Sequence, residues 1–210
     1  MTPTPPNPFD PEVTVLAAGE RLYRVHGNRR DATAFNPGVG EPTRFAFFEC
    51  HATGRTVPVL YAAAAQDAAV AETLLHDVPA SGGYLDYDDY AAKVMSRIVS
   101  TRPLRLATFH GVGLRRLRVT ADDLTGSPAT TYSATVDWAA AAHGAGYDGI
   151  VWMSRQCNDA KAYVFFGDRC GEAFEQDPGF GRAFVTGVDL LWLIDLCAPL
   201  GVDVLPPPAL

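Results

Sequence analysis

The sequence predicts an α+β fold, in which a mixed central β-sheet is flanked by helices. Three observations lead to this prediction: the expected strands outnumber the expected helices, the two kinds of element are interleaved, and no regular strand–helix–strand rhythm runs along the chain. A doubly wound parallel sheet would need that rhythm. Without a repeat or an internal linker, we expect one domain over residues 16–205, preceded by a Pro-rich, poorly ordered arm over residues 1–15.

The first expected strands surround a long loop. Leu22–His26 forms a short apolar strand, and residues 27–43 are rich in Gly, Asn, Asp and Pro, which favours a loop. Arg44–Phe48 is rich in aromatic residues and is expected as a strand. Val57–Ala62 alternates in polarity, which predicts a strand with Pro58 near its start.

Two helices are expected next. Asp67 is a plausible N-cap for a helix that continues to Val78. The residues of this helix that share a core-facing stripe are Val70, Ala71, Leu74, Leu75 and Val78. Glu72 lies off the centre of that stripe, so its side chain can face a cleft. Apolar residues at helical spacing predict a second helix over Tyr87–Val99.

The remaining elements are mostly strands. Four more segments are expected as strands: Leu104–His110, Leu114–Val119, Ile150–Met153 and Ala162–Phe166. Ser133 or a nearby Thr caps a helix that ends near His143, since Gly144 and Gly146 follow it. The pattern of the apolar segment Val188–Ile194 does not distinguish a helix from a strand, so this segment is left unassigned.

Composition and charge narrow the classes of function. The net charge of −7 argues against direct nucleic-acid binding, which needs a basic surface, although local arginines suffice for a small anion. No apolar run is long enough to span a bilayer, and the N-terminus lacks the pattern of a secretory signal. We therefore expect a cytoplasmic protein without membrane contact. The four cysteines form no CxxC pair, so no metal site is expected.

Several common catalytic motifs are missing from the sequence. It contains no GxxxxGK[ST], no GxGxxG after a strand, no HExxH and no GxSxG. Triphosphate-binding, dinucleotide-redox, zinc-protease and serine-hydrolase functions therefore lose their main support.

Five polar residues in four segments are the candidates for chemistry. Arg24 lies inside the apolar strand LYRVH, where a cation is costly unless it meets an anion. Arg44 leaves the long loop in TRF. Tyr61 ends a strand eleven residues before Glu72, and Ser154 ends the apolar segment GYDGIVWMSR. Each of these residues, taken alone, also fits an ordinary structural role, such as a surface Arg or a turn Ser.

Together these segments resemble the RES domain, a family named for its Arg, Glu and Ser. The resemblance runs from about Leu22 to Phe166 through LYRVH, TRF, VLYAAAAQDAAVAET, GYDGIVWMSR and AYVFF, in that order. It implies a fold like that of ADP-ribosyltransferases and the degradation of NAD⁺, which is the substrate, with no separate cofactor. It also implies a toxin role opposed by an Xre-type helix-turn-helix antitoxin. The residues that match the family are Arg24, Arg44, Tyr61, Glu72 and Ser154.

These residue types suit the cleavage of the nicotinamide–ribose bond. Positive charge develops on the ribose, and the Glu72 carboxylate can stabilise it. Nicotinamide leaves readily, so the reaction needs neither a metal nor a strong acid. Arg24 and Arg44 can hold the pyrophosphate in bidentate fashion. Tyr61 offers an aromatic face to a planar ring. Ser154 can hydrogen-bond the ribose or the carboxamide.

The sequence leaves alternatives open. With water or phosphate as the acceptor the enzyme is a glycohydrolase or a phosphorylase, and with a macromolecule it is an ADP-ribosyltransferase. A non-catalytic protein-binding module is a further alternative, suggested by the acidic surface and the Tyr87–Val99 segment. A cysteine-dependent acyl-transfer enzyme using Cys50 and His51 is disfavoured, because neighbouring residues on a strand point to opposite faces.

Overall fold

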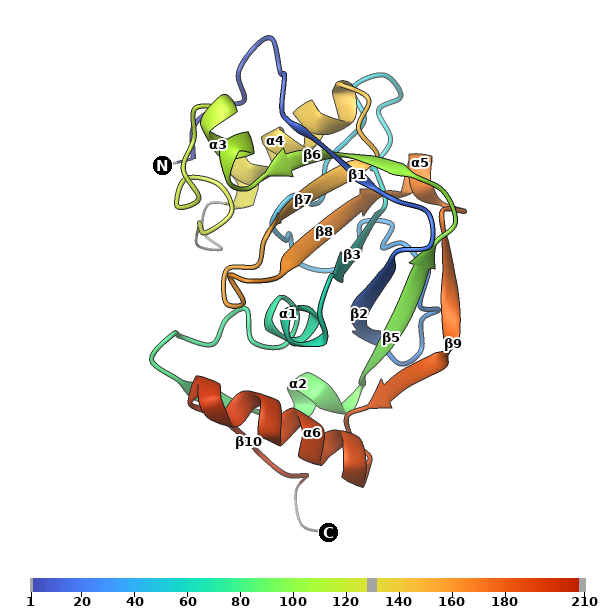
Figure 1. Ribbon diagram of the computed structural model, residues 1–210, viewed down its shortest axis with the longest axis vertical. Coiled ribbons are helices and arrows are strands. Elements are labelled where there is room, and N and C mark those ends of the chain that lie inside the picture. The colour runs from blue at the N-terminus through green and yellow to red at the C-terminus, as the bar shows by residue number, and fades with distance from the viewer. Residues whose placement is uncertain (1, 128–131, 208–210) are drawn as a thin grey trace.

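The structure is a computed structural model that describes residues 2–127 and 132–207 of the 210-residue chain. Its centre is an eight-stranded sheet with the order β1-β6-β7-β8-β3-β2-β5-β9 (Figure 1). The strands of this sheet are β1 (Val13–Leu16), β2 (Arg21–Gly27), β3 (Val59–Ala63), β5 (Lys93–Ser100), β6 (Leu104–Phe109), β7 (Gly149–Met153), β8 (Lys161–Phe166) and β9 (Phe174–Ala183). A small parallel pair consists of β4 (Gly83–Leu85) and β10 (Val202–Val204).

Helices pack around the large sheet. They are α1 (Gln66–Ala71), α2 (Tyr87–Ala91), α3 (Val112–Arg116), α4 (Tyr132–Gly144), α5 (Gly167–Cys170) and α6 (Gly187–Cys197), with a 3-10 turn at Ala198–Leu200. Neighbouring strands of the large sheet are antiparallel except for β6 and β7, which are parallel. This arrangement confirms the predicted α+β class with a mixed sheet. Within the described ranges, no helix has the length and apolar content that crossing a bilayer requires.

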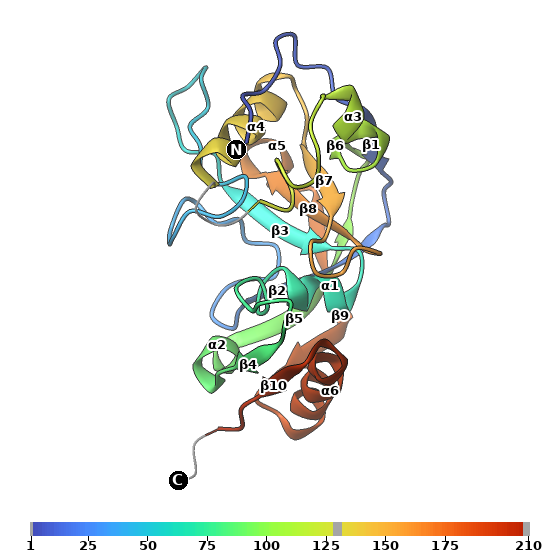
Figure 2. The ribbon, with the colours of Figure 1, turned by 90° about the vertical axis from the view of Figure 1, so that its left-hand side faces the viewer.

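The sheet has two halves that are covered by different helices. Figures 1 and 2 show α3 and α4 at one end of the molecule with β6 and β7, and α2 and α6 at the other end with β4 and β10. Trp138 of α4 packs with Ile150 and Phe166 in one core cluster, whereas Val70 of α1 packs with Met95 in another. The halves meet at β2 and β3, whose ladder consists of one residue pair. The two strands therefore diverge, and a cavity opens between them.

The expected helix over Tyr87–Val99 is wrong. Helix α2 ends at Ala91, and the chain continues as β5. Strand β5 pairs with β2 along its length, from Lys93 opposite Gly27 to Val99 opposite Arg21, and with β9 on its other side. Pairing with two neighbours outweighs the helical spacing of the apolar residues, and the β-branched residues of this segment favour the strand.

Two of the expected strands are also wrong. Leu114–Val119 begins in α3, and the buried side chain of Leu114 packs into the core from that helix. Arg44–Phe48 is an irregular loop, because Phe45 has the left-handed φ of 69° and Thr43 and Ala46 close a tight turn. The segment Val188–Ile194, which the sequence left unassigned, lies within α6.

Helix α1 is shorter than expected and begins differently. Ala65 occupies the cap position, so Asp67 is not the N-cap, although its carboxylate accepts a hydrogen bond from the Ala68 N–H. The helix ends at Ala71 instead of Val78, and turns continue the chain. The predicted stripe is otherwise confirmed. Its buried members are Val70, Ala71, Leu74 and Leu75, and Val78 is half-buried.

Two glycines mark the end of α4 and the close packing of β7, the strand that follows it. Ser133 lies inside α4 and is therefore not its cap, while the nearby candidates Thr130 and Thr131 fall outside the described residues. Gly146 follows the helix with a φ of +89°, which supports the predicted stop. A Cβ at Gly149 would lie 2.2 Å from the Val164 carbonyl oxygen, so the close approach of β7 and β8 requires glycine there.

Parts of the segment expected as a poorly ordered arm contact the rest of the chain. Strand β1 starts at Val13 and pairs with β6. The Trp138 indole N–H donates to the Pro3 carbonyl at 2.7 Å, and the Phe9 ring packs edge-on against Phe109. These contacts hold residues before position 16 against β6 and α4. The division into an arm and one domain over 16–205 stays a prediction.

Candidate active site

A cavity of about 680 Å³ opens where β2 and β3 diverge. Its walls include Arg24 of β2, Arg44 of the following loop, Tyr61 of β3 and Glu72 at the end of α1. Four of the five residues singled out from the sequence thus surround one space. The fifth, Ser154, is not part of the cavity wall but is in direct contact with Glu72.

Glu72 is held through one carboxylate oxygen. The buried Ser154 hydroxyl, 0% exposed, donates to Glu72 Oε1 at 2.7 Å, and the Arg155 backbone N–H donates to the same oxygen at 3.1 Å. The Ser154 hydroxyl also accepts from the Cys157 N–H at 3.3 Å, which fixes its direction. Across the described residues, Glu72 forms no salt bridge and its Oε2 has no hydrogen-bond partner. One oxygen is therefore fixed, and the other is free for a ligand.

Arg24 is a buried cation without an ion pair in the described part of the chain. Its side chain is 8% exposed, and Nη1 donates to the Ala32 carbonyl at 2.7 Å. Burial and the nearby positive charge of Arg30 lower the Arg24 pKa to about 10, against a smaller opposing effect of Asp31. A guanidinium with most of its donors unused and its charge uncompensated is well suited to an anionic ligand.

Arg44 is also buried, at 9% exposed, but part of its hydrogen-bonding capacity is used within the protein. Its Nη2 donates to the Ser127 carbonyl at 3.1 Å, and its guanidinium lies 5.4 Å from the centre of the Tyr132 ring. These contacts hold the guanidinium at the cavity wall. The remaining donors of the fork are the ones that a ligand can use.

Tyr61 shapes the loop that carries Arg44. Its hydroxyl donates to the Arg44 carbonyl and lies 3.1 Å from the Thr43 hydroxyl. Burial raises the Tyr61 pKa, so the phenol stays neutral and remains a donor. Its ring meets the Trp152 ring edge-on, with centroids 6.3 Å apart. Tyr61 therefore contributes an aromatic wall and fixes the position of Arg44.

Several residues of the site were missed by sequence reasoning. Arg155 directly follows Ser154, but only its backbone N–H binds Glu72, which no side-chain pattern reveals. Trp152 lines the cavity from β7, and its buried indole N–H has no partner among the described residues. Arg30 lines the cavity from the long loop, and Lys93 from β5, a segment that had been expected as helix.

The residues of the cysteine-based alternative lie elsewhere. Neither Cys50 nor His51 belongs to the cavity wall, and His51 lies in a turn whose N–H groups at Thr53 and Gly54 donate to the Cys50 carbonyl. Within residues 2–127 and 132–207, no three His, Cys, Asp or Glu side chains are grouped as metal ligands would be.

Comparison with known proteins agrees with this arrangement. Residues 21–185 match the RES domain family. A chain of the MbcT–MbcA toxin–antitoxin complex from M. tuberculosis has a similar fold, with a TM-score of 0.59 at 16% sequence identity, covering 80% of this chain and 85% of that chain. No curated protein matches the sequence. Because the family match spans most of its length, this chain belongs to the RES domain family.

Proposed function

We propose that this protein cleaves NAD⁺ between nicotinamide and ribose. The observation that carries the proposal is Glu72, a carboxylate with one oxygen fixed by Ser154 and the other free, in a cavity that also holds the buried cations Arg24 and Arg44. A carboxylate with a free oxygen beside two anion-binding groups matches a substrate that carries both a pyrophosphate and a ribose on which positive charge develops.

The chemistry follows from charge development. As the bond between ribose C1′ and the ring nitrogen breaks, its electron pair passes to the nicotinamide ring, which leaves as a neutral molecule. The ribose becomes an oxocarbenium-like cation, and the free oxygen of Glu72 stabilises it electrostatically. The acceptor then forms the new bond to C1′, and its proton passes to solvent. Because Oε1 is already held by Ser154, the carboxylate needs little reorganisation.

The two arginines supply affinity for the pyrophosphate. Arg24 has unused donors and no ion pair with a described carboxylate, so an incoming phosphate oxygen satisfies a charge that burial leaves uncompensated. Arg44 is held by Ser127 and by the loop that Tyr61 fixes, so it offers a preorganised second contact.

The biological role we propose is that of a toxin controlled by an antitoxin. The structural neighbour is part of a toxin–antitoxin complex, and loss of NAD⁺ by itself accounts for toxicity. The antitoxin partner, of the Xre helix-turn-helix type, is proposed from the family resemblance. We place the protein in the cytoplasm, where both NAD⁺ and such a partner are available.

The test is incubation of the purified protein with NAD⁺, followed by chromatography and mass spectrometry. We expect release of free nicotinamide. ADP-ribose as the co-product identifies water as the acceptor, and its 1″-phosphate identifies phosphate. A labelled macromolecule in treated lysate identifies an ADP-ribosyltransferase instead. If no nicotinamide is released by the wild-type protein under any of these conditions, the proposal is wrong and a non-catalytic binding role becomes the better explanation.

The contact between Ser154 and Glu72 leads to a separate prediction. Ser154→Ala removes one of the two donors that fix Glu72 Oε1 but leaves the cavity wall intact. We expect kcat to fall about 10-fold with a much smaller change in KM, because one hydrogen bond to a charged group contributes about 1.5–3 kcal/mol. Steady-state kinetics measures the split. Ser133→Ala, in α4, is the control, and a rise in KM with unchanged kcat would instead place Ser154 in substrate binding.

A further inference from the structure

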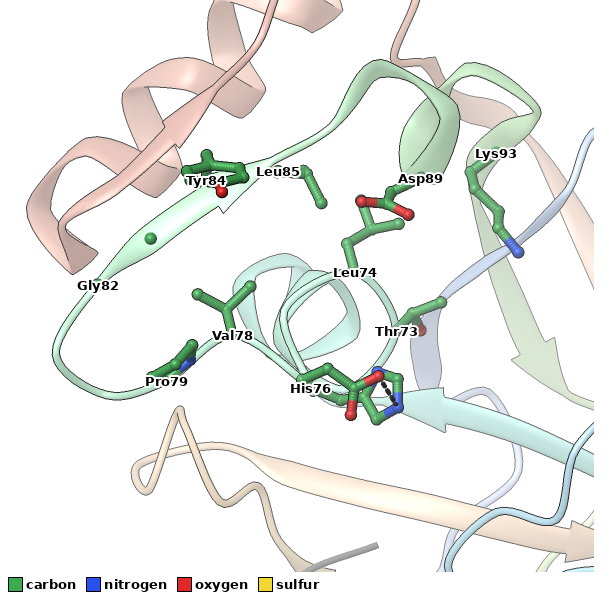
Figure 3. Close-up of a pocket in the computed structure, with 12 residues that line it drawn as sticks. Thr73, Leu74, His76, Val78, Pro79, Gly82, Tyr84, Leu85, Asp89 and Lys93 are labelled. Carbon is green, nitrogen blue, oxygen red and sulfur yellow. Dashed lines mark ion pairs between the residues drawn. The ribbon is translucent and has the colours of Figure 1, made fainter.

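A second cavity of about 620 Å³ adjoins the first. Figure 3 shows it between the turns that follow α1 and the segment of β4 and α2. Thr73, His76, Asp77 and Lys93 line both cavities, so the two spaces lie side by side at these residues.

Lys93 lies at the junction of the two cavities. It is the first residue of β5, opposite Gly27 of β2, and its side chain is half-buried. In the described structure its amino group has neither an ion pair nor a hydrogen bond to another side chain. In Figure 3 the amino group is directed away from Tyr84 and Val78. Lys93 thus presents an amino group without an ion pair where the cavities adjoin, and Asp89, which lines the second cavity with it, accepts a hydrogen bond from the Asp86 N–H at 3.2 Å.

This side of the first cavity is strongly cationic. Burial, then Arg24, and then Lys93 lower the pKa of His26, and the pKa of Arg24 is lowered by burial and by Arg30. The opposing carboxylate is Asp31, which is exposed and already accepts two hydrogen bonds from Thr33. The mutual repulsion of these basic groups is a cost that an anion in the cavity would remove.

The wall of the first cavity carries more fixed cations than carboxylates. The fixed cations of the first cavity are Arg24, Arg30, Arg44, Lys93 and Arg155, and its carboxylates are Glu41, Glu72 and Asp77. With Arg24 and Arg44 assigned to the pyrophosphate, the cations that remain are Arg30, Lys93 and Arg155, and none of them forms a salt bridge with a described carboxylate. The Asp77 carboxylate lies 3.0 Å from His76 Nε2 and forms no salt bridge with Lys93 or Arg30.

We propose that the site also takes the 2′-phosphorylated dinucleotide NADP⁺, with Lys93 contacting the 2′-phosphate at the junction of the two cavities. The inference rests on the proposed function, since it places the pyrophosphate at Arg24 and Arg44. A phosphate monoester adds about 1.5–2 negative charges at neutral pH, and Lys93, which has no ion pair among the described residues, can contact it. The second cavity provides the space beside the 2′-phosphate.

The experiment measures binding without turnover. In a Glu72→Gln background, isothermal titration calorimetry is carried out with NAD⁺ and with NADP⁺, before and after Lys93→Gln. We expect NADP⁺ to bind at least as tightly as NAD⁺. Lys93→Gln should weaken NADP⁺ binding about 10-fold and NAD⁺ binding less than about 3-fold, as expected for one charged contact to phosphate. Lys161→Gln, which changes the chain's other lysine outside both cavity walls, is the matched control.

A second measurement does not depend on the folding of the Lys93 variant. Acylation of the Glu72→Gln protein, read by mass spectrometry, should show Lys93 protected by NADP⁺ more than by NAD⁺, and Lys161 protected by neither. If NAD⁺ binds but NADP⁺ binds 10-fold more weakly, or Lys93→Gln affects both nucleotides equally, the inference is wrong and the proposed function stands. If neither nucleotide binds, both are overturned.

Discussion

Replacing Glu72 with Gln is expected to reduce NAD⁺ turnover by about 10³-fold while the protein folds normally. Gln has nearly the same shape, and its carbonyl oxygen can still accept from Ser154 and from the Arg155 N–H. What it lacks is the negative charge beside the ribose. Loss of one preorganised electrostatic contact to a transition state costs about 10²–10³ in kcat, and here the group supplies a full charge. Nicotinamide release and thermal unfolding measure the two parts of the prediction.

Asp67→Asn is the matched control for this substitution. Asp67 lies in the same helix and carries the same charge, but it is exposed and does not line the cavity. Its replacement should leave turnover within about 2-fold of wild type, since surface changes of this kind alter little. If Glu72→Gln retains near-normal turnover, or if both variants lose activity equally, Glu72 is not the group that stabilises the ribose cation.

Replacing Arg24 with Met is expected to weaken NAD⁺ binding about 100-fold and to stabilise the ligand-free protein. The loss of affinity reflects the removal of a charged, bidentate phosphate contact. The gain in stability arises because burial and, to a lesser extent, the charge of Arg30 lower the Arg24 pKa from 12.5 to about 10, which corresponds to a cost of about 3 kcal/mol for the charged native form. That cost is fully present below pH 10 and fades as the pH rises from the folded toward the unfolded pKa.

The expected net gain is smaller than this cost. The Ala32 carbonyl loses its donor, which offsets about 1–2 kcal/mol. A remaining gain of about 1 kcal/mol corresponds to a rise in Tm of about 2–4 °C for a chain of this size. Calorimetric titration measures the affinity for NAD⁺, and thermal unfolding measures Tm. Arg21→Met, an exposed position on the same strand, should change neither. A variant that loses stability and keeps its affinity would show that Arg24 is a structural residue.

The elements that sequence predicted well are those in which local pattern and long-range pairing agree. Leu22–His26 and Ala162–Phe166 are apolar segments bounded by loops, and each lies inside a strand that has a neighbour on either side. Tyr87–Val99 failed because its apolar spacing suits a helix equally well. The partner that decides the matter, β9, lies some eighty residues later in the chain, as Ser100 opposite Phe174 shows.

In the candidate site, too, the features visible in the local sequence were predicted and those that depend on distant contacts were not. An Arg inside an apolar strand and a Glu beside a helical stripe are visible locally, and the structure brings Arg24 and Glu72 to one cavity. The partner of Ser154 was not predictable, because the end of a strand gives the position of a side chain but not what it contacts. Lys93 could not be found from its surroundings in sequence, since its importance comes from the meeting of two cavities.

The position of Glu72 at the C-terminal end of α1 has one further consequence. The six residues of that helix align their peptide dipoles, and the partial negative end faces the position of Glu72. The field of the helix has the same sign as that of the carboxylate. It stabilises a positive charge near Glu72, such as the one that develops on the ribose, by about 0.3–1 kcal/mol. The backbone of a short helix therefore contributes in the same direction as the side chain that it carries.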